Sequence, residues 1–157
     1  MVAQYLIPTG FYNDSNLHTL TFTQQSPLTN TAIYQLFSSN TAVRVLSSGD
    51  YQVSYGMPVQ VTNTGAFSPN ITASVFLSQN GVPTALGASA QSVFVSPVAT
   101  EVNEGWATPS QIVILNMSSG DYISLTSMMS NNSITLPSAG INIIPSAGCH
   151  LSIHKIN

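Results

Sequence analysis

Apolar and polar residues alternate along most of this chain, in short segments separated by glycine, proline, asparagine and serine. Alternation with a period of two is the pattern of a strand that buries one face, and β-branched residues strengthen it. No segment shows the periodicity of an amphipathic helix. The segments predicted as strands are residues 2–7, 17–23, 32–37, 42–46, 51–62, 71–78, 89–98, 111–116, 122–127, 133–136, 140–144 and 149–156. The pattern therefore predicts an all-β chain of about ten strands, arranged as a β-sandwich or jelly roll.

The strongest turn signal along the chain is the dipeptide Asn80-Gly81, which follows the alternating residues Val75 and Leu77. This dipeptide favours the positive φ angles of a tight hairpin. Pro83 interrupts the segment that follows, so the pattern predicts a hairpin here without fixing the partner strand.

The pentapeptide Ser-Ser-Gly-Asp-Tyr occurs twice, at residues 47–51 and 118–122. In each copy the glycine supplies a backbone conformation that other residues avoid, and the aspartate is expected to accept hydrogen bonds from nearby backbone amides. The sequences that follow the two copies do not match, so a duplicated half-domain is not indicated. We interpret the repeat as one turn that is used twice to begin a long core strand. The structural turn residues are therefore Gly49, Asp50, Gly120 and Asp121.

The composition is unusual because hydrophobic residues make up 43% of the chain and charged residues only 4%. The length of 157 residues suits one folded domain that spans residues 1–157. Serine, threonine, asparagine and glutamine then have to provide a neutral, hydrated surface. The formal net charge is −3, and Arg44 and Lys155 are the only cations. Because binding to nucleic acid or to an anionic membrane needs clustered cations, we expect neither partner.

The N-terminal residues 1–10 lack the cationic start and apolar core of a signal peptide. No apolar run approaches the ~18–20 residues of a membrane span. A surface-type protein without an export signal fits a particle that is assembled inside a cell and released by lysis, such as a virion or a spore, or a domain cut from a longer chain. The single cysteine, Cys149, excludes an intrachain disulfide and is expected to be a small buried hydrophobe.

Four short motifs follow one another along the chain. They are Ser-Gly-Asp-Tyr-Gln-Val at residues 48–53, Val-Phe-Leu-Ser-Gln-Asn-Gly-Val-Pro at 75–83, Gly-Asp-Tyr-Ile-Ser-Leu at 120–125 and Leu-Ser-Ile-His-Lys-Ile at 151–156. In their order and spacing they resemble the tumour-necrosis-factor-like jelly-roll family, in particular its bacterial and phage versions, such as the globular head of the collagen-like spore-surface glycoproteins. The resemblance covers residues 40–156.

Members of that family are compact homotrimers, so the resemblance implies a homotrimer here. Contact at a common axis would bury apolar strand faces that a weakly charged surface alone leaves exposed. Aromatic residues on the early strands and two C-terminal histidines are candidates for this interface, although the aromatic residues are equally suited to fill the core. The candidate interface residues are Tyr34, Phe37, Tyr51, Tyr55, His150 and His154.

His150 and His154 are four residues apart on a predicted strand and therefore share one of its faces. Two histidines without a nearby acid make a poor metal site, so we predict neither a metal nor a cofactor. At a three-fold axis, a ring of one of these histidines would bind an anion or a metal. The alternative is that both are ordinary surface or interface residues.

The segment that carries Glu101, Glu104 and Trp106 is predicted to be a loop, and Trp106 is the only tryptophan of the chain. Two carboxylates beside an exposed aromatic ring could bind a sugar by stacking and hydrogen bonds, or a calcium ion through oxygen ligands. The alternative is a solvated loop with Trp106 tucked into the core.

No group of acid, base and nucleophile is evident, and no glycine-serine elbow or phosphate-binding loop occurs, so we expect no enzymatic activity. The leading hypothesis is a structural trimer on the outer surface of a virion, either a phage capsid decoration protein or a fibre head. One alternative is the head domain of a collagen-like glycoprotein on a bacterial spore surface. A second alternative is a carbohydrate-binding module. The expected partners are further copies of the chain, a capsid or surface-layer protein and, for the last alternative, a glycan.

Overall fold

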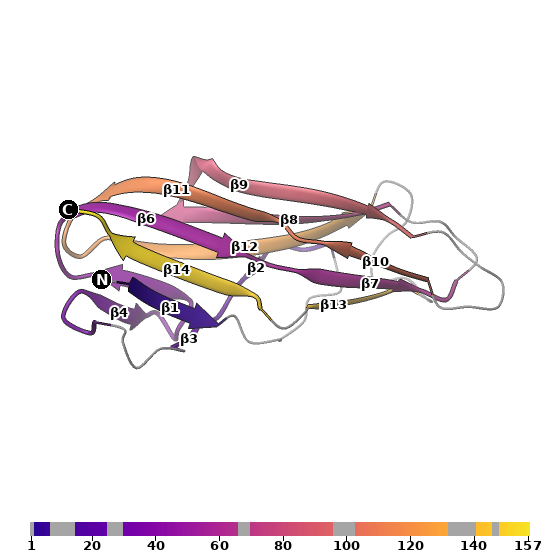
Figure 1. Cartoon of the computed structure of the whole chain (residues 1–157), viewed down its shortest axis with the longest axis horizontal. Helices are drawn as coiled ribbons and strands as arrows, with labels where there is room; N and C mark the ends of the chain where they lie inside the picture. Colours follow the sequence, from indigo (N-terminus) through magenta and orange to yellow (C-terminus); the bar gives the residue numbers. More distant parts are fainter. Residues whose placement is uncertain are drawn as a thin grey trace.

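Figure 1 shows the computed structural model of the chain, which describes residues 2–6, 15–24, 30–65, 70–95, 103–131, 141–145 and 148–157. Its strands are β1 (Val2–Leu6), β2 (His18–Thr19), β3 (Thr23–Gln24), β4 (Tyr34–Phe37), β5 (Ala42–Val45), β6 (Gly49–Gly56), β7 (Val59–Asn63), β8 (Asn70–Gln79), β9 (Val82–Phe94), β10 (Asn103–Ala107), β11 (Ser110–Met117), β12 (Tyr122–Asn131), β13 (Ile141–Pro145) and β14 (His150–Lys155). The described residues contain no helix, and so none long enough to cross a bilayer, and the all-β prediction is confirmed. The strand predicted at residues 133–136 lies outside the described residues.

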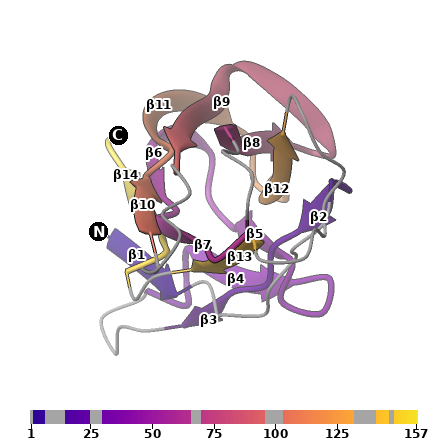
Figure 2. The same cartoon turned by 90° about the vertical axis from the view of Figure 1, so that its right-hand side faces the viewer.

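Two sheets of antiparallel strands form the sandwich. One has the order β11-β6-β14-β1-β3, and the other has the order β4-β5-β12-β8-β9 with β2 paired to β12. In the end view of Figure 2, β14 and β1 lie on one side of the sandwich and β12 and β2 on the other. Consecutive strands cross repeatedly between the two sheets, which is the connectivity of a jelly roll.

A third, three-stranded sheet has the order β10-β7-β13 and extends the first sheet along the long axis of the molecule (Figure 1). The order is the same as that of β11, β6 and β14, which these strands adjoin in sequence. Proline stands at each junction, at Pro58, Pro109 and Pro145. Because proline cannot donate to a ladder, three neighbouring strands are interrupted at one level. The single strand predicted over residues 51–62 is therefore wrong, since Pro58 divides it into β6 and β7.

The inward faces of the strands meet in one core. Alternate residues of β6, β8 and β12 point inward as the sequence pattern predicts, and the buried set includes Tyr51, Val53, Tyr55, Ile71, Ala73, Val75, Leu77, Ile123, Leu125 and Met129. Each fully buried aliphatic side chain stabilises the fold by about 1.5–3 kcal/mol relative to exposure. Cys149 is also buried, as predicted, and burial raises the pKa of its thiol to about 11.

The hairpin at Asn80-Gly81 joins β8 to β9. Asn80 and Gly81 have φ angles of 53° and 78°, as a type I′ turn requires. Its second strand begins at Val82, directly after the turn, and Pro83 lies opposite Ser78. Proline is tolerated there because β9 is the edge strand of its sheet. The predicted start of this strand at residue 89 is therefore too late.

Candidate functional site

The two Ser-Ser-Gly-Asp-Tyr segments lie side by side at the end of the sandwich that holds the C-terminus (Figure 1). The Ser119 amide donates to Ser48 Oγ over 2.9 Å, and the Gly120 amide donates to the Val45 carbonyl over 2.8 Å. One segment leads from β5 to β6, and the other returns from β11 to β12. The same turn therefore serves two adjacent crossings between the sheets. We call this region, residues 45–51 and 116–122 with Asn157, the turn end.

The two aspartates of the turn end bind different kinds of donor. Asp121 accepts a bond from the Ser118 amide at 2.9 Å and another from Asn80 Nδ2 at 2.8 Å. Asp50 instead accepts from side-chain amides, Asn116 Nδ2 at 2.8 Å and Asn157 Nδ2 at 2.9 Å. The expectation of backbone donors is therefore wrong for Asp50. The hydrogen bonds from Asn116 and then Asn157 lower the pKa of Asp50, and those from Asn80 and then Ser118 lower the pKa of Asp121.

The two glycines of the turn end also differ. Gly49 has a φ of 154°, and a Cβ atom at this position would lie 2.3 Å from the backbone oxygen of Asn157 and 2.6 Å from Lys155 Cε. Gly120 has a φ of 97° and open space around it. Gly49 is therefore required both for its backbone conformation and for the close approach of the C-terminal strand, whereas Gly120 is required for its conformation alone.

The three candidate interface tyrosines lie in the core instead of on the surface, so their assignment to an interface is wrong. Tyr34, Tyr51 and Tyr55 have exposed fractions of 1%, 0% and 2%. Tyr51 and Tyr55 occupy inward positions of β6, and the Tyr34 and Tyr51 rings meet edge to face at 6.1 Å. Their hydroxyls are bonded within the fold; Tyr55, for example, donates to the Gly87 carbonyl over 2.7 Å. Burial raises the pKa of Tyr55 to about 12.

Phe37 is half-buried on the opposite sheet. Its ring lies 5.5 Å from that of Tyr122, and the Arg44 guanidinium stands over it at 3.9 Å. The two aromatic rings and the cation form one local cluster. The Phe37 ring therefore packs against residues of its own chain.

His150 and His154 are exposed on the outward face of β14, as their spacing predicts. The carbonyl oxygen of Gly148 lies 2.8 Å from His150 Nδ1. Across the ladder, His154 lies opposite Gln52, and Gly56 lies opposite His150, with Ser152 and Ser54 paired between them. Within the described part of the chain, no three histidine, cysteine or acidic side chains group closely enough to hold a metal. The outward face of β14 and β6 is polar, with two small serines between the larger His150, His154 and Gln52 side chains.

An exposed apolar edge, which we define as Leu86, Ile112 and Ile114, borders this face. The exposed fractions of the three side chains are 76%, 65% and 66%. They line one shallow depression where the edge strands β9 and β11 of the two sheets meet. The alternation of apolar and polar residues did not predict this edge. The sequence does contain a signal for a covered outer face here. The run from Ile112 to Leu115 is apolar at every position, as in a strand that is covered on both faces.

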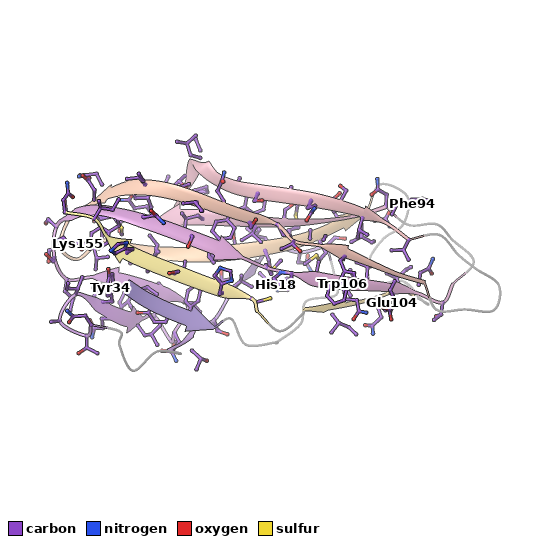
Figure 3. The ribbon with its side chains drawn as sticks, in the orientation of Figure 1. His18, Tyr34, Phe94, Glu104, Trp106 and Lys155 are labelled. Carbon is purple, nitrogen blue, oxygen red and sulfur yellow. The ribbon has the colours of Figure 1, made fainter. Side chains whose placement is uncertain are left out.

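The predicted loop around Trp106 is the strand β10, which pairs with β7. Trp106 has an exposed fraction of 53%, and Glu104 is exposed on the same side of the strand (Figure 3). Glu101 lies outside the described residues. Gly105 weakens the strand pattern in the sequence, because glycine is uncommon in strands. The structure requires glycine here, since a Cβ atom would lie 2.3 Å and 3.0 Å from methyl carbons of Val93 and Val95.

Cross-strand pairing places four further side chains around Trp106 and Glu104. Trp106 lies opposite Gln60, and Gln60 lies opposite Ile144. In the next row, Glu104 lies opposite Thr62, which lies opposite Asn142. Directly opposed residues share a face of the sheet, so the six side chains form one outward surface. We call the six residues Gln60, Thr62, Glu104, Trp106, Asn142 and Ile144 the platform.

No family model and no curated protein matches the sequence. Solved structures do match its fold over nearly the whole length. Murine APRIL at pH 8.0 is 16% identical, with a TM-score of 0.55, and the match covers 99% of this chain and 98% of that one. The Eiger TNF structure from S. frugiperda is 15% identical, with a TM-score of 0.56, and covers 100% of this chain and 92% of its own. At this level of identity the likeness concerns the fold: the chain has the jelly-roll fold of tumour-necrosis-factor-like proteins.

Proposed function

We propose that this chain is a non-enzymatic structural protein that assembles as a homotrimer and is displayed on the outer surface of a particle. The leading form is a phage capsid decoration protein or fibre head on a virion. The alternative is the head domain of a collagen-like glycoprotein on a bacterial spore surface.

The observation that carries the proposal is the apolar edge. Leu86, Ile112 and Ile114 are large aliphatic residues that stand together in water in a chain with very few charges. Covering each would contribute about 1.5–3 kcal/mol before the cost of association. The molecule that is always available to cover the apolar edge is a second copy of the same chain.

The surface next to the edge supports contact between different patches of identical chains. The outward face of β6 and β14 carries the paired residues Ser54 and Ser152, whose small size would let a neighbouring subunit approach closely. An edge that packs against a different face of the next copy makes a heterologous contact, and such contacts form a ring, as in a trimer, when the rotation between copies closes. His150 and His154 would then lie at the contact and not in a metal site.

The display on a particle is supported by the composition and the surface chemistry. Only 4% of the residues are charged, and a surface of neutral amides and hydroxyls is insensitive to salt. A trimer that binds across neighbouring subunits of a shell would stabilise the shell through several simultaneous contacts, without catalysing any reaction.

The native mass, measured by light scattering, tests the assembly. We expect three times the 16.6 kDa of one chain, and we expect Ile112→Asp to give folded monomers, because a carboxylate cannot be buried unpaired at the contact. Leu17→Asp is the matched control, since Leu17 is 60% exposed but lies beside β2 on the other sheet. A monomeric parent protein would contradict the trimer, and a trimeric I112D variant would show that the apolar edge is not its contact.

Co-sedimentation tests the particle. Capsids stripped of the protein should bind the added trimer and become more resistant to heat, whereas the I112D variant should bind much more weakly because multivalency is lost. Binding to isolated spores instead of capsids would favour the spore-surface alternative.

A further inference from the structure

We infer that the platform is a binding site for a neutral saccharide. This inference concerns the sheet of β10, β7 and β13 and does not depend on the oligomeric state. It assigns a ligand class to Gln60, Thr62, Asn142 and Ile144, which join Trp106 and Glu104 only through the pairing of the strands.

The platform has the shape that a sugar ring requires. Neighbouring strands lie about 4.8 Å apart, and a two-residue step along a strand is about 7 Å, so the six side chains cover about 10 Å by 7 Å. The exposed indole of Trp106 offers a flat apolar surface for the C–H face of a pyranose ring. Ile144, which is 42% exposed, provides a second apolar contact at the far side of Gln60.

Polar groups for the sugar hydroxyls stand beside this apolar surface. Among the described residues, none makes a hydrogen bond to the side chains of Gln60, Glu104 or Asn142, in contrast to the amides of the turn end. Apart from the backbone ladders, the only hydrogen bond within the platform among the described residues is the one that Thr62 Oγ1 donates to the carbonyl oxygen of Asn142 over 3.4 Å. The two amides and the carboxylate therefore offer hydrogen-bond donors and acceptors to the sugar hydroxyls. Small-ligand sites use a few such polar groups beside an apolar surface to fix the orientation of the ligand.

The charges favour a neutral ligand over an acidic one. Glu104 is the only charged residue of the platform, and the chain has two cations. Arg44 stands over Phe37 in the opposite sheet, and Lys155 donates to Ser47 at the turn end, far from Trp106 in Figure 3. Among the described residues, no cation lies at the platform to pair with the carboxylate of a sialic or uronic acid, and Glu104 would repel that carboxylate.

A second copy of the chain fits the platform less well than it fits the apolar edge. Protein covering this surface would have to pair the side chains of Gln60, Glu104 and Asn142 or leave them buried without partners. A saccharide brings hydroxyl groups that both donate and accept, and water can fill the remainder.

The test uses the only tryptophan as its reporter. Trp106 is the sole source of indole fluorescence, so its emission can be titrated with neutral oligosaccharides of glucose, mannose, galactose and N-acetylglucosamine, with sialyllactose as the acidic probe. We expect a saturable change with at least one neutral sugar, with a dissociation constant of about 1 mM as suits a small open site, and none with sialyllactose.

Variants separate the platform from the rest of the surface. By calorimetry, Trp106→Ala should weaken binding about tenfold or more, and Asn142→Ala should weaken it about threefold to tenfold. Phe94→Ala is the matched control, because Phe94 is also an exposed aromatic residue, at 63%, but lies on β9 outside the platform. It should bind as the parent does.

Four outcomes would overturn the inference, three of them in the binding measurements. These three are a failure of every neutral sugar to change the emission at 50-fold the expected dissociation constant (about 50 mM), equal binding by W106A and the parent, and preference for the acidic probe. A drop in native mass for W106A without any sugar binding would identify the platform as a contact between copies and would also overturn it.

Discussion

At the turn end of the sandwich, asparagine, serine and aspartate side chains are bonded to one another, whereas on the platform the amide and carboxylate side chains have no partner among the described residues. Asn116 and Asn157 each donate to Asp50, and Asn80 donates to Asp121. Gln60 and Asn142 lie on the outward face of β7 and β13 beside an exposed indole, and these strands lie away from the turn end (Figure 1). In a chain with so few charges, amides therefore serve two purposes, and only their partners distinguish a structural amide from one available to a ligand.

The difference has a physical cause in the paths of the strands. At the turn end, two crossings between the sheets and the C-terminal strand converge, so polar side chains from distant segments meet. On the platform, three straight strands place their side chains in parallel rows that face water. The polar side chains of the turn end therefore bond to one another, whereas those of the platform face outward, where a ligand can reach them.

The largest effect that would sharpen this comparison is expected from Gly49→Ala at the turn end. The new Cβ would meet the backbone of Asn157 at 2.3 Å in an unfavourable backbone conformation. We expect a loss of about 3 kcal/mol in the free energy of unfolding, measured by urea denaturation. Gly120→Ala is the internal control, since it has open space and should cost about 1 kcal/mol. Equal losses for the two variants would show that the contact with Asn157 does not matter.

A smaller effect is expected when the turn end is titrated. Hydrogen bonds lower the pKa of Asp50, mainly from Asn116, and of Asp121, mainly from Asn80. A lowered pKa in the folded state stabilises the protein above the ordinary aspartate value of about 3.9, and this stabilisation is lost as the pH falls through the folded value. The melting temperature should therefore hold down to about pH 5 and decline below about pH 4.

The doubly substituted variant Asp50→Asn, Asp121→Asn isolates this contribution. It cannot titrate at the turn end, so its melting temperature should decline less between pH 5 and pH 2.5 than that of the parent. An unchanged decline would assign the acid sensitivity to other carboxylates.

The smallest effect is expected on the platform. Trp106 and Asn142 are exposed, and their side chains are not bonded into the core, so Trp106→Ala and Asn142→Ala should change the free energy of unfolding by less than about 0.5 kcal/mol. Urea denaturation measures this, with Gly49→Ala as the contrasting case. A loss of 2 kcal/mol or more would mean that the platform is structural, which would remove the main difference between the two ends.

Several parts of the structure follow from residue patterns alone. Alternation identified the inward faces of β6, β8 and β12, and Asn80-Gly81 identified the hairpin, because burial of one face and positive φ angles are local demands on the sequence. The strand β10 was not predictable in this way. Its residues Asn103, Glu104 and Gly105 have low strand propensity, and pairing with β7 and close packing against Val93 and Val95 hold them extended.

The sequence by itself determined the all-β class, which residues of a strand share one face, and the repeated turn, since each depends on neighbours within a few residues. Tertiary structure alone decided that Tyr34, Tyr51 and Tyr55 fill the core and that Ile112 and Ile114 are left in water. It also decided which residues stand beside Trp106, because register across strands far apart in the chain brings Gln60 and Ile144 into its row. The reason is that a strand pattern specifies which side chains share a face, whereas what that face meets depends on the path of the rest of the chain.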